Sequence, residues 1–201
     1  MNILLIAPPL FLDNKRKLFP RYPPYIMLSV GASLENAGFK VKAYDAFLEG
    51  ANLAEIGDLV RQARPSLIGL CPADVTRFPP VEIDIELINF LKKYFPDIPV
   101  CVFGIGKKSI IDALISKAPS IDYVLLGDPD ETMVELAGQI DKKEGTNRIQ
   151  GLMGKHATGG FFITGEPRII DNLDRLLPPA WHLIDLNRYY FFPHRYKISK
   201  A

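Results

Sequence analysis

Short apolar runs alternate with segments of helical period up to Asp141, and this alternation most constrains the fold. The runs are Ile3–Ala7, Lys40–Tyr44, Leu67–Cys71, Val100–Phe103 and Tyr123–Leu126. Between them, apolar side chains recur every three or four residues, as in Ile26, Val30 and Leu34. Five strands that alternate with five helices predict a parallel sheet with helices on both faces. We therefore predict a doubly wound, mainly parallel, five-stranded α/β sheet of the Rossmann-like (flavodoxin-like) type.

The pattern changes after Asp141. The runs Arg148–Met153 and Phe161–Thr164 are joined by glycines and predict a β-hairpin. Residues 171–196, called the strap below, are rich in proline and aromatic residues and have no clean period. We therefore predict two parts: a Rossmann-like domain over residues 1–145, and a hairpin and linker over residues 146–201.

One helix start carries a specific signal. The order Asp128, Pro129, Asp130 and Glu131 places an acid, a proline and a second acid where a helix would begin. This order predicts a capping box, in which Asp128 and Glu131 bond reciprocally to backbone N–H groups.

Composition excludes several partners. A formal net charge of +1 argues against nucleic acid or a charged membrane surface as a partner. The two cysteines, Cys71 and Cys101, lie in apolar runs, so buried reduced thiols are expected, and two thiols cannot hold an iron–sulfur cluster. The apolar run at the N-terminus is too short for a signal peptide or a membrane span. We therefore expect a cytoplasmic protein.

Several chemistries do not fit the loops that follow the strands. The first strand is followed by Pro8 and Pro9, where a dinucleotide site would need a G-x-G-x-x-G motif. A phospho-acceptor receiver would need an aspartate where Cys71 stands. The three histidines have no partner at metal-ligand spacing. We therefore identify no catalytic centre within the 201 residues.

The loop from Pro8 to Pro24 is long for a connection of this kind and lies where such sheets bind ligands, at the carboxyl ends of the strands. Its length indicates a functional loop, with a disordered flap as the alternative.

The order of several segments resembles the N-terminal half of a cobalamin-dependent radical-SAM enzyme of the Fe–S oxidoreductase type. These segments are RYPPYIMLSVGASLENAGFKVKAYDA (21–46), PSLIGLCPADVT (65–76), PDIPVCVFGIG (96–106), IDYVLLGDPDETMVEL (121–136), IQGLMGK (149–155) and IIDNLDRLLPPAWHLID (169–185). The resemblance implies a cobalamin-binding domain and, in cis, a radical-SAM barrel with a 4Fe–4S cluster and S-adenosylmethionine. The C-x3-C-x2-C motif of that barrel is absent from the 201 residues.

The stretch DAFLEG (45–50) has the form of the cobalt-ligating D-x-H-x-x-G loop, with Phe47 in place of the histidine. In histidine-ligating cobalamin domains that loop follows the first strand, whereas DAFLEG follows the second, so we interpret the match as a coincidence. Residues 8–24 contain no histidine. The resemblance therefore implies a cobalamin bound in the base-off, His-off state.

The resemblance also implies which residues hold the cofactor. Pro8 and Pro9 would begin the loop beneath the corrin, and Pro23 and Pro24 would close it. The other expected cofactor-binding residues are Cys71, Pro72, Ala73, Val75 and Thr76 around the nucleotide tail, Gly104, Ile105 and Gly106 after the fourth strand, and Gly127, Glu131 and Thr132 at a helix start. Turn or cap chemistry is the alternative for each, and the more favoured one for Glu131.

The expected function is that of a cobalamin-binding domain in a radical-SAM enzyme. This domain would support methyl transfer, or related chemistry such as ring formation, in the full-length protein without being catalytic itself. The alternative is a Rossmann-like scaffold that no longer binds cobalamin and positions the barrel or a protein partner.

Overall fold

The computed structural model describes residues 1–9, 22–72, 81–156 and 158–189. Its strands form one sheet in the order β2-β1-β3-β4-β5-β6-β7. The strands are β1 (Asn2–Ala7), β2 (Lys40–Asp45), β3 (Leu67–Leu70), β4 (Val100–Val102), β5 (Tyr123–Leu125), β6 (Leu152–Lys155) and β7 (Phe161–Thr164). The first five are parallel and confirm the predicted strands, and the order of these five is that of flavodoxin-like folds.

The predicted hairpin is also confirmed, and it continues the same sheet. β6 pairs antiparallel with β5, with Val124 opposite Met153, and β7 pairs antiparallel with β6. Over the described residues the sheet therefore has seven strands, with an antiparallel edge on a parallel centre.

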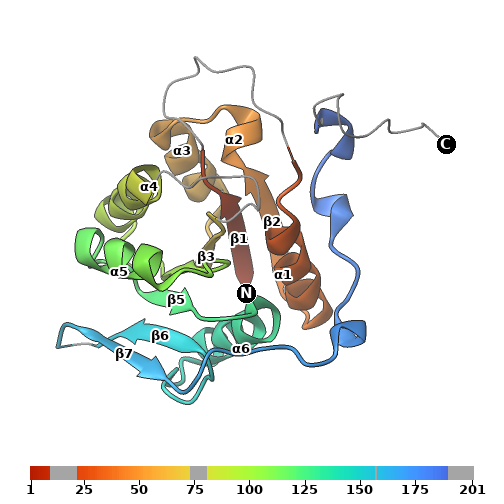
Figure 1. The fold of residues 1–201 in the computed structure, drawn as a ribbon. Helices are drawn as coiled ribbons and strands as arrows, with labels where there is room; N and C mark the ends of the chain where they lie inside the picture. The colour runs from red at the N-terminus through yellow and green to blue at the C-terminus, as the bar shows by residue number, and fades with distance from the viewer. Residues whose placement is uncertain (10–21, 73–80, 157, 190–201) are drawn as a thin grey trace.

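The helices cover both faces of the sheet (Figure 1). They are α1 (Tyr25–Asn36), α2 (Ala46–Glu49), α3 (Leu53–Ala63), α4 (Val81–Tyr94), α5 (Lys108–Lys117) and α6 (Pro129–Lys142). α3, α4 and α5 pack on the face that carries Leu4 and Ile6, whereas α1 and α6 pack on the face that carries Ile3 and Leu5. Alternate side chains of a strand point to opposite faces of the sheet. A strand that is covered by helices on both faces therefore reads as a continuous apolar run rather than as an alternation of apolar and polar residues.

The side chains of Cys71 and Cys101 are buried, as predicted. Both belong to the core beneath α1 and α6, and burial raises the pKa of the Cys101 thiol well above its usual value. Among the residues that the structure describes, no helix has the length and apolarity needed to cross a membrane.

The short helix α2 explains the DAFLEG stretch. The Asp45 carboxylate accepts hydrogen bonds from the N–H groups of Phe47 and Leu48, each at 3.0 Å, and so caps the helix start. Gly50 ends the helix with φ of 65°, a conformation that favours glycine. In this chain the Asp and Gly of the pattern therefore begin and end a single helical turn.

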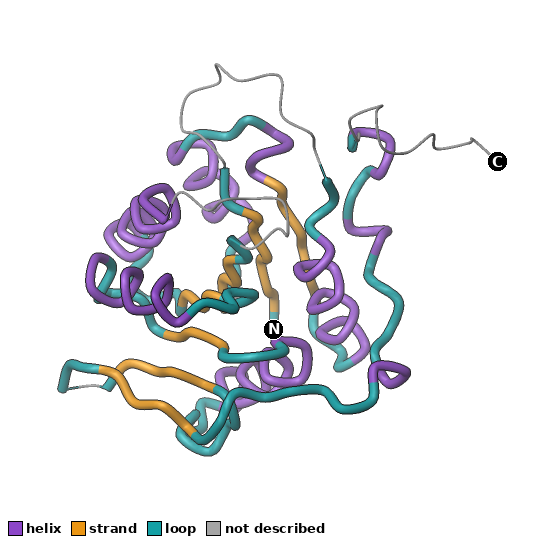
Figure 2. Tube along the Cα trace, in the orientation of Figure 1, coloured by secondary structure: helices purple, strands orange, loops and turns teal. Residues whose placement is uncertain are grey.

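The described part of the strap runs along α1 as loop interrupted by three short 3-10 helices (Figure 2). These are η1 (Leu173–Arg175), η2 (Trp181–Leu183) and η3 (Leu186–Arg188). Ala180 is buried, and its N–H donates to the Leu28 carbonyl of α1 at 3.0 Å. The Leu183 side chain sits against Gly31 of α1, where an added Cβ would lie 3.0 Å from it. The strap is therefore docked on α1.

Candidate functional site

A cavity of about 370 Å³ lies at the carboxyl edge of the sheet. Its walls are Tyr25, Ile26 and Ser29 of α1, residues 104–106 after β4, residues 127–130 after β5, and Leu176 of the strap. Doubly wound sheets bind ligands at this edge, and a volume of roughly 300–1,000 Å³ is usual for a small-molecule site.

Four of the predicted cofactor-binding residues meet in this cavity: Gly104, Ile105, Gly106 and Gly127. Gly104 has φ of 79°, so its place in the turn after β4 favours glycine. Around Gly106 an added Cβ would meet nothing within 4 Å. The backbone at Gly106 is therefore open to a ligand. Ile105 is 8% exposed and packs into the core beneath α3, α4 and α5.

Gly127 has a structural partner as well as a place in the cavity wall. Its φ is 83°, and an added Cβ would lie 2.0 Å from the carbonyl oxygen of Arg168. Gly127 and Arg168 form an isolated parallel bridge, and the Asp128 N–H donates to the Arg168 carbonyl at 2.7 Å. The segment after β7 therefore passes directly against the turn that precedes α6.

Glu131 and Thr132 do not line the cavity. The Glu131 carboxylate lies 3.1 Å from the Arg168 guanidinium, and the fully buried Thr132 hydroxyl lies 3.5 Å from the Gln150 carbonyl. Asp128 is the N-cap of α6 and Pro129 follows it, but the predicted capping box is wrong, because the Asp128 side chain makes no cap bond. It accepts instead from the Ile170 N–H at 2.7 Å, since the segment after β7 approaches this carboxylate.

The remaining predicted residues follow β1 and β3 at the same edge or precede α1. Pro8 and Pro9 come directly after β1, and Pro24 is the N-cap of α1 with Pro23 before it. Cys71 is 2% exposed and donates its N–H to the Ile6 carbonyl, with Pro72 after it. Ala73, Val75 and Thr76 lie outside the described residues, as do residues 10–21.

Sequence reasoning missed the buried polar pair Ser29 and Asp130. Each residue is 6% exposed, and the Ser29 hydroxyl donates to the Asp130 carboxylate at 2.6 Å, which joins α1 to α6. Burial raises the pKa of the Asp130 carboxyl, and the hydrogen bond from Ser29 partly offsets this. In the sequence, Asp130 resembled an ordinary first-turn acid.

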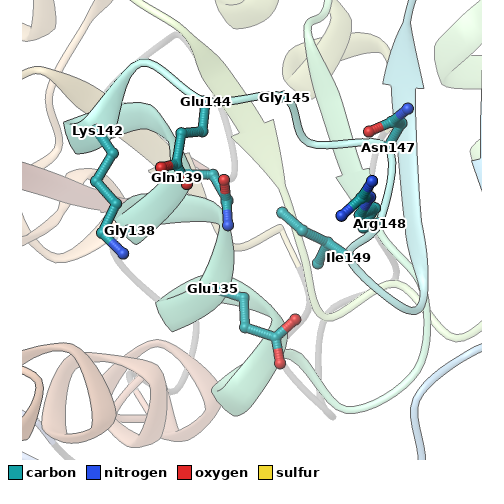
Figure 3. Close-up of a pocket in the computed structure, with 9 residues that line it drawn as sticks. All are labelled: Glu135, Gly138, Gln139, Lys142, Glu144, Gly145, Asn147, Arg148 and Ile149. Carbon is teal, nitrogen blue, oxygen red and sulfur yellow. The ribbon is translucent and has the colours of Figure 1, made fainter.

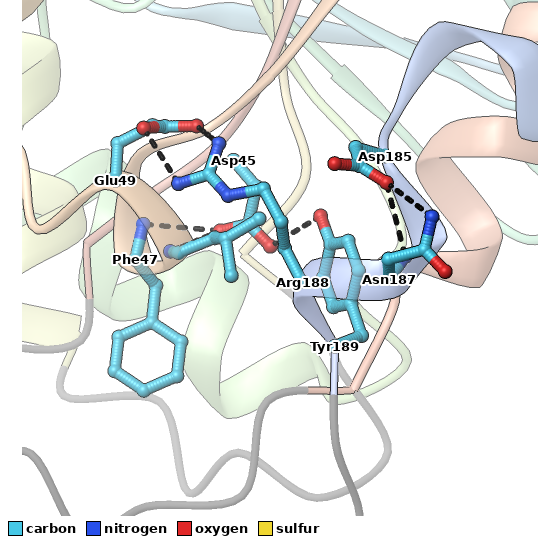
Figure 4. A network of polar contacts seen from close by, with 8 residues as sticks. Asp45, Phe47, Glu49, Asp185, Asn187, Arg188 and Tyr189 are labelled. Atoms are coloured by element: carbon cyan, nitrogen blue, oxygen red, sulfur yellow. Dashed lines mark hydrogen bonds and ion pairs between the residues drawn. The ribbon is translucent and has the colours of Figure 1, made fainter.

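The strap is tied to the end of β2 by a polar network (Figure 4). The Tyr189 hydroxyl donates to Asp45 at 3.1 Å, and the Arg188 guanidinium forms two hydrogen bonds with Glu49, one of them at 3.0 Å. Burial, followed by the nearby Asp45 carboxylate, raises the pKa of the Tyr189 hydroxyl, which therefore stays protonated and donating. The remaining residues of the strap, 190–196, lie outside the described residues.

Replacing Tyr189 with Phe is expected to lower the free energy of unfolding by about 1–2 kcal/mol, because a partly buried carboxylate loses a donor. Urea denaturation measures the loss, and limited proteolysis reports whether the strap is cleaved faster. Tyr94→Phe is the matched control, since Tyr94 is 55% exposed on α4. Equal effects of the two substitutions would contradict the role assigned to Tyr189.

A larger cavity of about 740 Å³ lies elsewhere, between the second half of α6 and residues 144–149 (Figure 3). The end of α6 is near the start of β1, because the Met1 amino group lies 3.6 Å from the Asp141 carboxylate. This cavity is therefore remote from the carboxyl edge, and its walls carry mixed charges such as Glu135, Lys142 and Arg148. Its position makes it the weaker candidate.

No family model matches the chain. The chain is 25% identical over 192 residues to the anaerobic magnesium-protoporphyrin IX monomethyl ester cyclase of Synechocystis sp. (strain ATCC 27184 / PCC 6803 / Kazusa), with 96% of this chain and 38% of the relative covered. It is 21% identical over 203 residues to the cyclase of the same name from Rubrivivax gelatinosus, with 99% and 36% covered. The chain thus spans less than two-fifths of the length of these relatives.

Two solved structures are similar in fold. One is the radical S-adenosylmethionine methyltransferase TsrM of Kitasatospora setae with cobalamin and a [4Fe-4S] cluster bound, with a TM-score of 0.68, 22% identity, and 89% of this chain and 31% of that chain covered. The other is the cobalamin-dependent S-adenosylmethionine radical enzyme OxsB with aqua-cobalamin and S-adenosylmethionine bound, with a TM-score of 0.69, 13% identity, and 89% and 24% covered. These similarities confirm the resemblance that the sequence predicted.

Proposed function

We propose that this chain is a cobalamin-binding domain that acts beside a radical-SAM domain of the same protein. The observation that carries the proposal is the cavity at the carboxyl edge, which Gly104, Gly106 and Gly127 line and where the backbone at Gly106 is open to a ligand. The fold supports it, because two structures of similar fold hold cobalamin.

The cavity fits part of a corrinoid. With a volume of about 370 Å³ it suits a nucleotide tail, while the much larger macrocycle would lie over the edge of the sheet. Glycine backbone, together with Tyr25 and Ile26, would hold the tail. Pro8 and Pro9 after β1, and Pro23 and Pro24 before α1, would border the ring. The bound cofactor would supply a cobalt–carbon bond, and the protein would supply its placement.

We place the cofactor in the base-off, His-off state. The His156 ring lies beside the Phe162 ring in the hairpin, tilted by 60° with centroids 5.1 Å apart, and the His182 imidazole lies 2.9 Å from the Glu35 carboxylate. Neither lines the cavity, and residues 8–24 contain no histidine. Without a nitrogen ligand from the protein, the bound corrinoid would be easier to reduce, which makes this arrangement chemically reasonable.

The longer protein would contain the cluster and S-adenosylmethionine in its other domain, reached through the strap. On this proposal residues 1–145 form the cofactor domain and residues 146–201 lead toward the barrel. Methyl transfer is supported by the methyltransferase of similar fold, and ring formation by the two cyclase relatives. The scaffold alternative would apply if the carboxyl edge binds no corrinoid.

The test is a titration with hydroxocobalamin, followed by desalting and a visible spectrum. A Gly106→Leu variant places a side chain in the cavity and is expected to weaken binding at least about tenfold. Gly138→Leu is the matched control, because Gly138 lies in the wall of the larger cavity and an added Cβ there also meets nothing within 4 Å. It should leave binding unchanged.

The outcomes separate the alternatives. Loss of binding in Gly138→Leu alone would move the site to the larger cavity. After reduction to Co(II), an EPR spectrum with nitrogen superhyperfine splitting would contradict the base-off, His-off state. If no corrinoid is retained by this chain or by a longer protein carrying the barrel, the scaffold function holds instead.

A further inference from the structure

We propose that Ser29 and Asp130 form an acceptor site for a hydrogen-bond donor on the nucleotide tail of the corrinoid, so that the tail contributes to affinity and selectivity. This inference rests on the proposed function and goes beyond it, because it assigns a recognition role to two side chains.

The first support is the position of the pair. Ser29 and Asp130 both line the cavity, although each side chain is almost wholly buried by protein. The Asp130 carboxylate receives the Ser29 hydroxyl at 2.6 Å, and its own backbone N–H and Ser33 contribute further hydrogen bonds. A carboxylate has about four acceptor positions, so these three donors leave one position for a ligand.

The second support is the charge of the cavity. Among the described residues, its lining contains the carboxyl groups of Asp128 and Asp130 and no lysine, arginine or histidine. The Asp128 carboxylate is tied to the segment after β7 by the Ile170 N–H at 2.7 Å, whereas Asp130 lies between α1 and α6.

The partial positive charge at the start of α6 does not make the cavity favour an anion over a hydrogen-bond donor. A helix N-terminus ordinarily attracts anions, but Asp128, Asp130 and Glu131 already stand at this one. A phosphate would therefore meet carboxylates, with no compensating cation in the part of the lining that the structure describes. The chemistry of the cavity favours the donor groups of a nucleotide tail and places its phosphate outside.

Two parts of a tail carry such donors. The ribose hydroxyl is present in every nucleotide tail, including that of cobalamin, whose dimethylbenzimidazole base has no donor once attached. An adenine base adds an amino donor. Cobinamide, which has the corrin ring without the nucleotide, has neither. These three corrinoids therefore separate the sources of the hydrogen bond.

The experiment measures dissociation constants for cobalamin, adeninylcobamide and cobinamide with the wild-type chain, Asp130→Asn and Ser29→Ala. Asn keeps the shape of Asp130 and can still accept from Ser29, but it loses the charge that strengthens the bond to a ligand donor. We expect Asp130→Asn to weaken the binding of cobalamin and adeninylcobamide about tenfold, the equivalent of one charge-assisted hydrogen bond. The dissociation constant of cobinamide should stay within about twofold of its wild-type value. Ser29→Ala is also expected to weaken the binding of cobalamin and adeninylcobamide more than that of cobinamide.

Asp112→Asn is the matched control, because Asp112 is exposed on α5 and outside the cavity. A loss confined to adeninylcobamide would identify the base as the donor, and an equal loss for both cobamides would identify the ribose. Either result supports the acceptor site. An equal loss for cobinamide, or no loss for any corrinoid, would overturn it and leave the pair as a link between α1 and α6. Absence of all corrinoid binding in the wild-type chain would overturn the proposed function, and this inference with it.

Discussion

Replacing Gly127 with Ala is expected to lower the free energy of unfolding by about 4 kcal/mol. The added Cβ would lie 2.0 Å from the Arg168 carbonyl oxygen and 2.9 Å from its nitrogen, and backbone atoms cannot rotate away as a side chain does. The backbone at Gly127 also has φ of 83°, which costs an L-residue roughly 1–2 kcal/mol before any contact is counted. The urea midpoint, followed by far-UV circular dichroism, measures the loss.

Gly106→Ala is the matched control for this substitution. Gly106 lines the same cavity, but an added Cβ there meets nothing within 4 Å. Its free energy of unfolding is expected to change by less than about 0.5 kcal/mol. The two glycines would then have separate roles, with Gly127 required by the fold and Gly106 by the ligand. Equal destabilisation by both substitutions would contradict this division.

Replacing Asp122 with Ala is expected to cost about 3 kcal/mol. The Asp122 carboxylate lies 2.8 Å from the Lys92 ammonium and accepts the Val100 N–H at 2.8 Å. The Lys92 side chain is only 11% exposed, so the substitution would leave a largely buried cation with two backbone carbonyls and no counter-charge. It would also remove the acceptor of the Val100 N–H.

Asp112→Ala is the control for this prediction. Asp112 pairs with Lys108 at 2.9 Å, but the two side chains are 57% and 87% exposed. Such a pair contributes about 0.5 kcal/mol or less. Thermal unfolding of both variants checks the contrast, and a loss in Asp122→Ala no larger than in Asp112→Ala would show that burial of the pair adds nothing. Corrinoid binding by the folded fraction should be unchanged in either variant, because neither aspartate lines the carboxyl-edge cavity.

The parallel core of the fold was predictable because its signal is local. Each strand is a short apolar run and each long helix has its own period, so the five parallel strands follow from segments of a few residues. The hairpin was predictable for the same reason, but its pairing was not. β6 joins β5 through contacts such as Val124 with Met153, and no periodicity within either strand specifies that partner.

The residues of the candidate site also divide into those that a local sequence signal could reveal and those that it could not. Gly104, Ile105, Gly106 and Gly127, which the family resemblance singled out, line one cavity because the loops after the parallel strands β4 and β5 lie at the same edge of the sheet. The capping box failed because the local signal at Asp128 could not reveal Ile170, which reaches this carboxylate only after the chain returns from β7. Ser29 and Asp130 were missed because they are 101 residues apart and each looks ordinary in its own helix.

The sequence by itself therefore determined the alternation of strands and helices, the parallel core they form, and the edge at which a ligand would bind, since these depend on local hydrophobic period and on the handedness of strand connections. Only the tertiary structure decided what Gly127 must accommodate, where the strap docks, and which acid lines the cavity from within the packed helices. Those features depend on contacts between distant segments, and their free energy exists only after the chain has folded.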